Sequence, residues 1–180
     1  MSRIHLVRHG RSAHVHAGWV DLDGFHRWRE SYEAAAILAD ETAPAAVVEL
    51  AKSARVIAAS NTPRAIASAK LLREEDIVLS PLLRELDLKP LTLRGIKLPL
   101  ALWALTFAIR RTLATPSEEA RARDAAVMVE ELAHEGDVVV VTHHTFRSLL
   151  AKTLMGRGWE SGKKPGPRHW SVWTLERSSQ

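Results

Sequence analysis

The sequence predicts an α/β protein, a three-layer α/β/α sandwich around a mostly parallel central sheet. Two observations lead to this prediction. Short apolar runs rich in Val and Ile alternate along the chain with longer segments in which apolar residues recur at helical spacing. These short runs are continuous, which is typical of strands that helices cover on both faces. Strands that alternate with helices in this way favour a parallel sheet.

Five segments are expected to form the strands of the sheet. Four are short apolar runs with β-branched members, and the fifth, near the C-terminal end, resembles an edge strand. The five segments are residues 4–7, 56–59, 77–79, 138–141 and 169–175.

Helices are expected at six places between these strands, and start and stop signals support several of them. Thr62 is a good N-cap before Pro63 at the first helical position. Thr115 to Glu118 reads as a capping box. Glycine is expected to end the last two helices. The six helices are expected over residues 28–38, 44–50, 63–72, 99–111, 116–135 and 146–155, and a Gly-, Lys- and Pro-rich connector over 156–168.

The composition is that of a folded protein. Of its 180 residues, 46% are hydrophobic and 26% are charged, which excludes intrinsic disorder and a collagen-like fibre. The absence of Cys excludes a disulfide scaffold and a thiol nucleophile. We find no repeat and no linker, and expect one domain over residues 1–180. The net charge of +4 favours an anionic partner, while no nucleic-acid-binding motif is present.

The longest nearly uncharged apolar run spans residues 98–109. It is shorter than the roughly 18 residues of a membrane-spanning helix, and the charged N-terminal segment does not read as a secretory signal. We therefore expect a cytoplasmic protein without a membrane span. The run itself is compatible with a buried helix or with an exposed apolar lid, and we favour core packing or a contact in a homodimer.

Basic and imidazole side chains follow three of the predicted strands. Arg8 and His9 follow the first strand, Arg64 follows the second, and His143 and His144 follow the fourth. Ligand sites in open α/β sheets gather beyond the carboxyl ends of the strands. The three strand ends are therefore expected to converge on one anion site.

Phosphate chemistry fits this set of residues. Arg8 and Arg64 can each present forked donors to phosphate oxygens, and Arg64 lies in the first turn of a helix, whose positive end attracts anions. A neutral imidazole is a nucleophile toward phosphorus, and cationic neighbours keep His9 neutral near pH 7. Gly10 leaves room for the phosphate.

Three motifs follow these strands in order: Leu6-Val-Arg-His-Gly10, Ser60-Asn-Thr-Pro-Arg64-Ala65 and Val140-Val-Thr-His143. Together they resemble the motifs of the histidine phosphatase superfamily, also called the phosphoglycerate mutase-like family. The resemblance covers residues 4 to about 154 and implies a phosphoglycerate mutase-like fold. Position 144 is His where that family usually has Gly, so either of the two adjacent histidines could face the site, and the register favours His143.

The resemblance implies a role for each matching residue. His9 would attack the phosphoryl group and carry it as a phosphohistidine. Arg8, Arg64 and His143 would hold the phosphoryl oxygens, and Ser12 occupies a phosphate-binding position where the family has Thr or Ser. The resemblance implies no metal and no cofactor.

A carboxylate would protonate the leaving oxygen and then help to activate water. Glu85, in Leu83-Arg84-Glu85-Leu-Asp87, is the candidate that the resemblance implies, with Asp87 in reserve. A solvated loop carboxylate is the alternative interpretation of Glu85.

The predicted function is a metal-independent phosphomonoester hydrolase, a histidine phosphatase. The chain is short after the acid, where mutases carry an insertion, so hydrolysis is favoured over phosphomutase action. A non-enzymatic phosphate-binding or interaction protein is the other alternative. The substrate would be a phosphorylated small molecule or a phosphoprotein. His14, His16 and His26 are interpreted as a polar loop near the pocket mouth rather than as a metal site.

Overall fold

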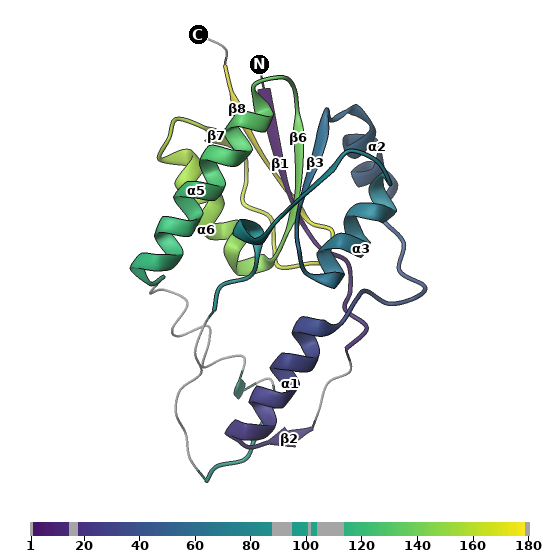
Figure 1. The fold of residues 1–180 in the computed structure, drawn as a ribbon, viewed down its shortest axis with the longest axis vertical. Helices are drawn as coiled ribbons and strands as arrows, with labels where there is room; N and C mark the ends of the chain where they lie inside the picture. Colours follow the sequence, from purple (N-terminus) through teal and green to yellow (C-terminus); the bar gives the residue numbers. More distant parts are fainter. Residues whose placement is uncertain (1, 15–17, 88–94, 101, 104–113, 179–180) are drawn as a thin grey trace.

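The computed structural model describes residues 2–14, 18–87, 95–100, 102–103 and 114–178. A six-stranded sheet with the strand order β4-β3-β6-β1-β8-β7 lies at its centre (Figure 1). The four strands β4, β3, β6 and β1 run parallel, and β8 runs antiparallel to both of its neighbours. The strands are β1 (Ser2–Arg8), β3 (Val56–Ser60), β4 (Ile77–Ser80), β6 (Val138–Thr142), β7 (Glu160–Ser161) and β8 (Val172–Arg177).

Helices cover both faces of the sheet. On one face, α2 (Ala45–Ser53) and α3 (Pro63–Leu72) pack against the side chains that β1, β3 and β6 direct to that side. On the other face, α5 (Pro116–Ala133) and α6 (His144–Met155) pack against the alternate positions of the same strands. The predicted three-layer sandwich with a mostly parallel sheet is thereby confirmed.

Local signals located several elements well. The Thr115 hydroxyl accepts a hydrogen bond from the backbone N–H of Glu118 at 3.3 Å, as the capping box predicts. Helix α6 ends before Gly156. The first four strands lie where the apolar runs predict them, each longer by one to three residues. The positions of the central strands and of these helix ends could therefore be predicted from short stretches of sequence.

The helix predicted over residues 28–38 is misplaced, because α1 spans Leu22–Ala34. The Asp21 carboxylate accepts a hydrogen bond from the backbone N–H of Gly24 at 2.8 Å and starts the helix early. Ala35 has an extended backbone and ends it. The apolar side chain that α1 buries is Phe25, not those of the alanine-rich segment after it.

The prediction of a C-terminal edge strand is also wrong. Strand β8 starts at Val172, and β7, formed within the predicted connector, pairs along its outer side and takes the edge. Trp170 has a φ of 59°, in the left-handed region that a strand does not enter. The strand can therefore begin only after this residue.

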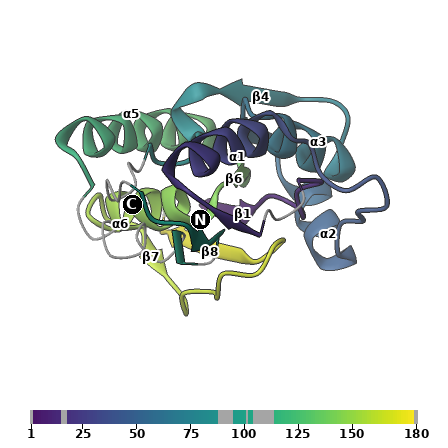
Figure 2. The same cartoon turned by 90° about the horizontal axis from the view of Figure 1, so that it is seen from below.

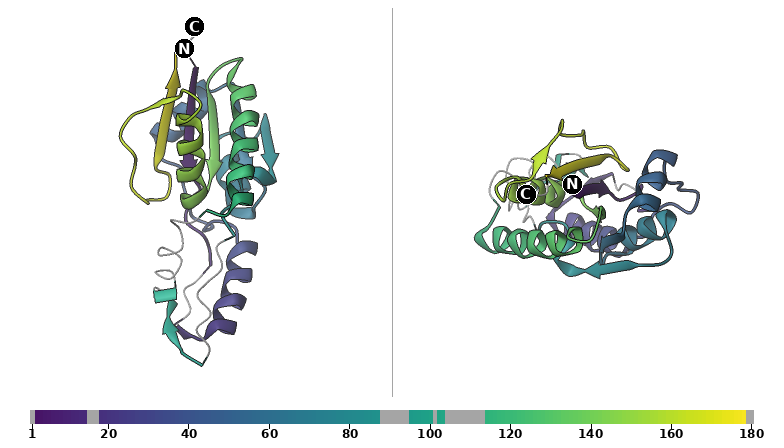
Figure 3. Two further views of the ribbon diagram at one scale, coloured as in Figure 1. Left: turned by 90° about the vertical axis from the view of Figure 1, so that its left-hand side faces the viewer. Right: turned by 90° about the horizontal axis from the view of Figure 1, so that it is seen from above.

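A small unit formed by α1, β2 (Trp19–Val20) and β5 (Leu98–Pro99) lies beyond one end of the sheet (Figures 1 and 3). Leu100 and Trp103 are buried against Phe25, so these two members of the apolar run belong to a core. The helix predicted over 99–111 begins with a strand residue, and its residues 101 and 104–111 lie outside the described ranges. In the part of the chain that is described, no helix is long and apolar enough to cross a membrane.

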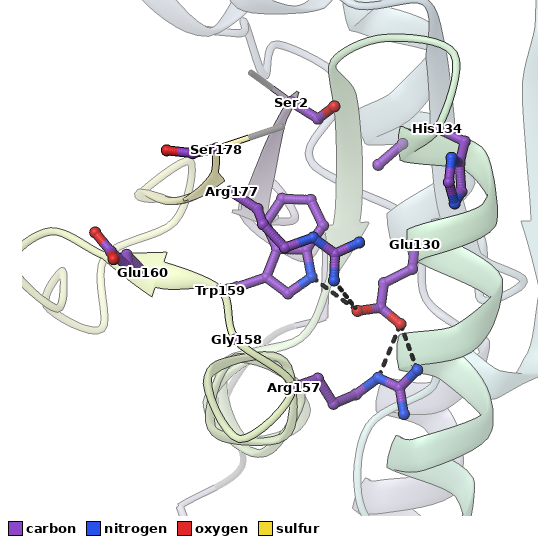
Figure 4. A pocket seen from close by; sticks show the side chains of 10 residues that line it. Ser2, Glu130, His134, Arg157, Gly158, Trp159, Glu160, Arg177 and Ser178 are labelled. Carbon is purple, nitrogen blue, oxygen red and sulfur yellow. Dashed lines mark hydrogen bonds and ion pairs between the residues drawn. The ribbon is translucent and has the colours of Figure 1, made fainter. Parts of the chain in front are cut away.

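A buried carboxylate ties the opposite end of the sheet together (Figure 4). Glu130 of α5 accepts hydrogen bonds from Arg157 at 2.6 and 2.8 Å, from the indole of Trp159 at 2.8 Å and from Arg177 of β8 at 3.0 Å. The Arg177 guanidinium also lies 4.6 Å from the centre of the Trp159 ring. The cluster borders a cavity of about 660 Å³, and it joins α5, the end of α6 and β8.

We expect Glu130→Gln to lower the free energy of unfolding by about 1–3 kcal/mol, the value of hydrogen bonds to a charged group. Burial alone would raise the pKa of Glu130, but the hydrogen bonds from Arg157 and Trp159 and the charges of Arg157 and Arg177 hold it below its ordinary value. The carboxylate therefore stabilises the fold above the pKa of the unfolded chain, and this contribution is lost as the pH falls through the folded pKa.

Urea unfolding of the wild type and the variant at neutral and acidic pH measures this difference. Glu131→Gln, at the exposed neighbouring position, is the matched control and should have little effect. If the difference in free energy of unfolding between Glu130→Gln and the wild type stays constant down to acidic pH, the charged form of Glu130 is not the source of the stabilisation.

Candidate active site

Three neighbouring parallel strands end at one edge of the sheet, and this edge faces α1 (Figures 1 and 2). The register pairs Arg8 of β1 with Thr142 of β6, and Ala59 of β3 with Val141 of β6. The residues that directly follow these pairs are therefore close together. They include His9 and His143, whose side chains form the centre of the candidate site.

His9 is buried and oriented by the backbone. Its Nδ1–H donates to the carbonyl oxygen of Gly10 at 2.7 Å, because a carbonyl can only accept. Burial lowers the pKa of His9 well below its ordinary value, and the charges of Arg64 and Arg8 lower it further, while the Gly10 hydrogen bond opposes them. The ring is therefore neutral, and its Nε2 carries the lone pair that a nucleophile needs.

Gly10 is required by close packing. A Cβ atom at this position would lie 2.9 Å from a ring carbon of Trp170 and 3.1 Å from the Glu41 side chain. Trp170 is itself held by a 2.7 Å hydrogen bond from its indole to Glu41. The backbone N–H of Gly10 donates to the Ser68 hydroxyl of α3 at 2.8 Å. These contacts fix the turn that carries His9.

His143 lies beside His9, with the ring centres 5.0 Å apart in an edge-to-face arrangement. Its Nδ1 accepts from Arg64 Nη2 at 3.3 Å, since a guanidinium can only donate. Its Nε2 lies 3.0 Å from the hydroxyl of Ser60 and 3.3 Å from that of Thr62. Burial lowers the pKa of His143 well below its ordinary value, with further contributions from His9 and the nearby arginines.

Arg64, at the start of α3, is fully buried. Its Nη1 donates to the carbonyl oxygens of Tyr32 at 3.0 Å and Glu33 at 3.5 Å, at the end of α1. Its Nη2 lies 3.1 Å from a carboxylate oxygen of Glu33. The guanidinium also stacks on the Tyr32 ring at 4.4 Å. Arg64 thus joins the sheet edge to α1.

Arg8 lies near the same centre, and Arg147 in turn lies near Arg8. Arg8 donates to the carbonyl oxygen of Pro167 and interacts with Tyr32. Arg147, one turn into α6, is buried and donates to Ser171 O at 2.6 Å and to Gly166 O at 3.2 Å. Burial, together with the charge of Arg8, lowers the pKa of Arg147 to about 10. It remains cationic at neutral pH.

These arginines present buried donors without acceptors. Within the described ranges, the Nε–H groups of Arg8, Arg64 and Arg147 are buried and have no hydrogen-bond partner. Unsatisfied buried donors are rare and costly in folded proteins. Two of these arginines, Arg8 and Arg64, place their charge near the neutral ring of His9, which favours an anion there.

Glu85 lies at the N-terminus of α6. Its carboxylate accepts hydrogen bonds from the backbone N–H groups of Phe146 at 2.8 Å, Leu86 at 3.1 Å and Thr145 at 3.2 Å. Burial raises the pKa of Glu85 above its ordinary value, although these three amides and the charge of Arg64 oppose the rise. The carboxyl group is therefore easier to protonate than a solvated one, as a general acid requires.

The chain around Glu85 is anchored by Arg121 of α5. This guanidinium donates to the carbonyl oxygens of Arg84 at 2.8 Å, Leu82 at 2.9 Å and Glu85 at 3.3 Å. Asp87, the reserve candidate, points away: its side chain is 66% exposed and paired with Arg29. Of the two carboxylates, Glu85 is therefore the buried one, beside the N-terminus of α6.

The Ser12 hydroxyl accepts a hydrogen bond from the backbone N–H of His14 at 3.2 Å. In the part of the chain that the structure describes, no hydrogen bond joins it to the group around His9. The His14 ring packs on Trp28 and Tyr32, and the His26 ring on Phe25. His16 lies outside the described residues, and within them no cluster of three or more potential metal ligands occurs.

Three residues of the site escaped the sequence interpretation. Tyr32 comes from α1, Arg147 from α6, and His169 from the turn before β8, where its Nδ1–H donates to the His9 carbonyl at 3.0 Å. The His169 ring lies 5.4 Å from that of His9. Of the three, only Arg147 could have been found from the sequence. It lies four residues after His143, and this spacing places two residues on the same face of a helix.

No family model matches the sequence, and the curated proteins contain no match. Solved structures do match. A phosphoserine phosphatase from Entamoeba histolytica is 14% identical, with 97% of this chain and 90% of that chain covered and a TM-score of 0.55. A mycobacterial glucosyl-3-phosphoglycerate phosphatase is 18% identical, with 87% and 80% covered and a TM-score of 0.51.

An alpha-ribazole phosphatase from Shigella flexneri is 16% identical, with 86% of this chain and 80% of that chain covered and a TM-score of 0.50. All three are phosphatases by name, and at these identities the similarity is one of fold. The motifs beyond β1, β3 and β6 predict the same fold independently. The chain thus has the fold of the histidine phosphatase superfamily.

Proposed function

We propose that this protein is a phosphomonoester hydrolase that acts through a phosphohistidine at His9. One observation carries the proposal: the buried neutral imidazole of His9 lies near the guanidinium groups of Arg8 and Arg64, and each of these retains a buried Nε–H that has no hydrogen-bond partner within the described residues. Such a cluster suits a phosphoryl group, which brings negative charge and acceptor oxygens. That solved structures with this fold include phosphatases supports the same proposal.

In the first step, the His9 Nε2 lone pair attacks phosphorus, and the bond between phosphorus and the ester oxygen breaks. The Glu85 carboxyl group gives its proton to the departing oxygen. Arg8 and Arg64 stabilise the charge on the transferred group. Once Arg64 Nη2 turns from His143 Nδ1 to a phosphoryl oxygen, His143 can donate to that group as well, because the Ser60 hydroxyl can then donate to Nε2 and the ring proton can reside on Nδ1.

In the second step, the Glu85 carboxylate accepts a proton from water while the water oxygen attacks phosphorus. The bond between phosphorus and Nε2 breaks, and its electron pair returns to His9. Inorganic phosphate leaves, and Glu85 is again protonated. Glu85 thus takes part in both proton transfers, and the proton that restores it comes from the attacking water. The phosphate acceptor is water, which distinguishes this proposal from phosphomutase action.

We expect the wild type to hydrolyse an aryl phosphate after treatment with a metal chelator, and His9→Ala to lose at least about 10³-fold in rate because the nucleophile is absent. Reactions quenched with alkaline detergent should trap an acid-labile, base-stable phosphoenzyme in the wild type alone. His134→Ala, exposed at the opposite end of the sheet, is the control and should keep its activity. A phosphoenzyme that forms equally in His9→Ala would exclude His9 as the phosphoryl carrier.

Glu85→Gln should slow hydrolysis of alkyl phosphates by about 10²–10⁴-fold, the usual contribution of general acid catalysis. Activated aryl phosphates should slow far less in the first step, because their leaving oxygen does not need the proton. Single-turnover rates for a series of leaving groups measure this, with Asp87→Asn as the matched control. Equal losses across the series would rule out proton donation by Glu85.

The pH dependence of the activity should also report the protonation of Glu85. Burial raises the pKa of Glu85, and the acid form is the active one, so activity toward alkyl phosphates should fall as the pH rises through that pKa. Glu85→Gln cannot titrate, and its residual activity should lack this alkaline decline. The profile of kcat/KM for both proteins tests the assignment, and an unchanged decline in the variant would refute it.

A further inference from the structure

The Nη1 and Nη2 donors of Arg64 have different partners. Nη1 is committed to the end of α1, where it donates to the carbonyl oxygens of Tyr32 and Glu33. Nη2 faces His143 Nδ1 at 3.3 Å and the Glu33 carboxylate at 3.1 Å. Because His143 lies beside His9, Nη2 is the donor that a phosphoryl group on its way to His9 would meet.

The Glu33 carboxylate therefore occupies a donor that the proposed reaction needs. Its side chain is 33% exposed, whereas that of Arg64 is fully buried, so the carboxylate reaches in from the solvent side. Its other oxygen lies 3.9 Å from Arg84 Nη2, and the Arg84 side chain is 52% exposed. Glu33 thus has two cationic partners, one inside the site and one at its surface.

We propose that the Glu33 carboxylate is a built-in competitor for the phosphoryl group: it holds Arg64 Nη2 in the free protein and moves to Arg84 when a phosphate binds. The inference rests on the proposed function and names the residue that sets the affinity of that site for anions. In this proposal Arg84 is the residue that receives the displaced Glu33 carboxylate.

Two physical requirements favour such an exchange. A buried guanidinium without a partner carries a large desolvation cost, so Arg64 needs an anion even when the site is empty. An internal carboxylate meets that need, and a phosphoryl group that brings more charge and more acceptor oxygens can displace it. The bonds from Nη1 to α1 are not involved in the exchange. The helix can therefore stay in place while the carboxylate moves.

The test is the affinity for inorganic phosphate, measured by isothermal titration calorimetry with the wild type, Glu33→Gln and Glu30→Gln. We expect Glu33→Gln to bind about tenfold more tightly than the wild type, the scale of one hydrogen bond to a charged group. Glu30 is exposed on the same helix, so its variant should match the wild type. Thermal unfolding of each variant checks that the fold is retained.

A double-mutant cycle separates displacement from a general change of charge. Arg84→Gln should weaken phosphate binding by about threefold in the wild type, where it removes the second partner of Glu33. Its effect should be smaller in Glu33→Gln, where the charge of Arg84 still acts on the site but no carboxylate has to move. An equal effect of Arg84→Gln in both backgrounds would overturn the exchange.

The remaining outcomes distinguish this inference from the proposed function. If the wild type and Glu33→Gln bind phosphate equally well, the competitor is refuted while the phosphate site stands. If neither of them binds phosphate, the proposed function fails and the inference fails with it.

Discussion

The burial of one guanidinium group, that of Arg64, is the constraint on which the arrangement around His9 depends. A fully buried cation has to be surrounded by acceptors, and Arg64 obtains them from α1, from Glu33 and from His143. The same contacts hold α1 against the edge of the sheet where β1, β3 and β6 end. The stability of that junction and the anion affinity of the site are therefore coupled, because both draw on the donors of one side chain.

Burial also decides the protonation of the histidines. The ring centres of His9 and His143 are 5.0 Å apart, and both residues are buried near Arg8 and Arg64, so a proton on either ring would be placed among cations and away from solvent. Desolvation is the largest cause of the low pKa in both, and the neighbouring charges add to it. The carbonyl of Gly10 and the Nη2 of Arg64 then select which nitrogen of each neutral ring is unprotonated. The backbone and burial thus keep His9, the nucleophile of the proposed reaction, neutral and oriented.

The sequence was informative wherever the signal is local. Continuous apolar runs located β1, β3, β4 and β6, and parallel pairing of these strands brought His9, Arg64 and His143 together as predicted, because the carboxyl ends of neighbouring parallel strands share one edge. Contacts between residues far apart in the chain could not be predicted from the sequence. Tyr32 enters the site only because α1 docks on Arg64, and His169 only because a turn with a left-handed Trp170 folds back over His9. The position of α1 depends in the same way on Arg64, and the edge strand β7 forms only by pairing with β8.

Glu85, the general acid of the proposed reaction, also has a structural role. Three backbone amides, two of them in the first turn of α6, aim at its oxygens, and Arg121 holds the backbone that carries it. These amides favour the charged form, while burial favours the neutral form and prevails. The net effect is a raised pKa, so the carboxyl group holds its proton to a higher pH than a solvated carboxylate does. An acid that gives up its proton in one half of a reaction and recovers it in the other benefits from a pKa raised in this way, and a fully solvated carboxylate such as Asp87 lacks the burial that would provide it.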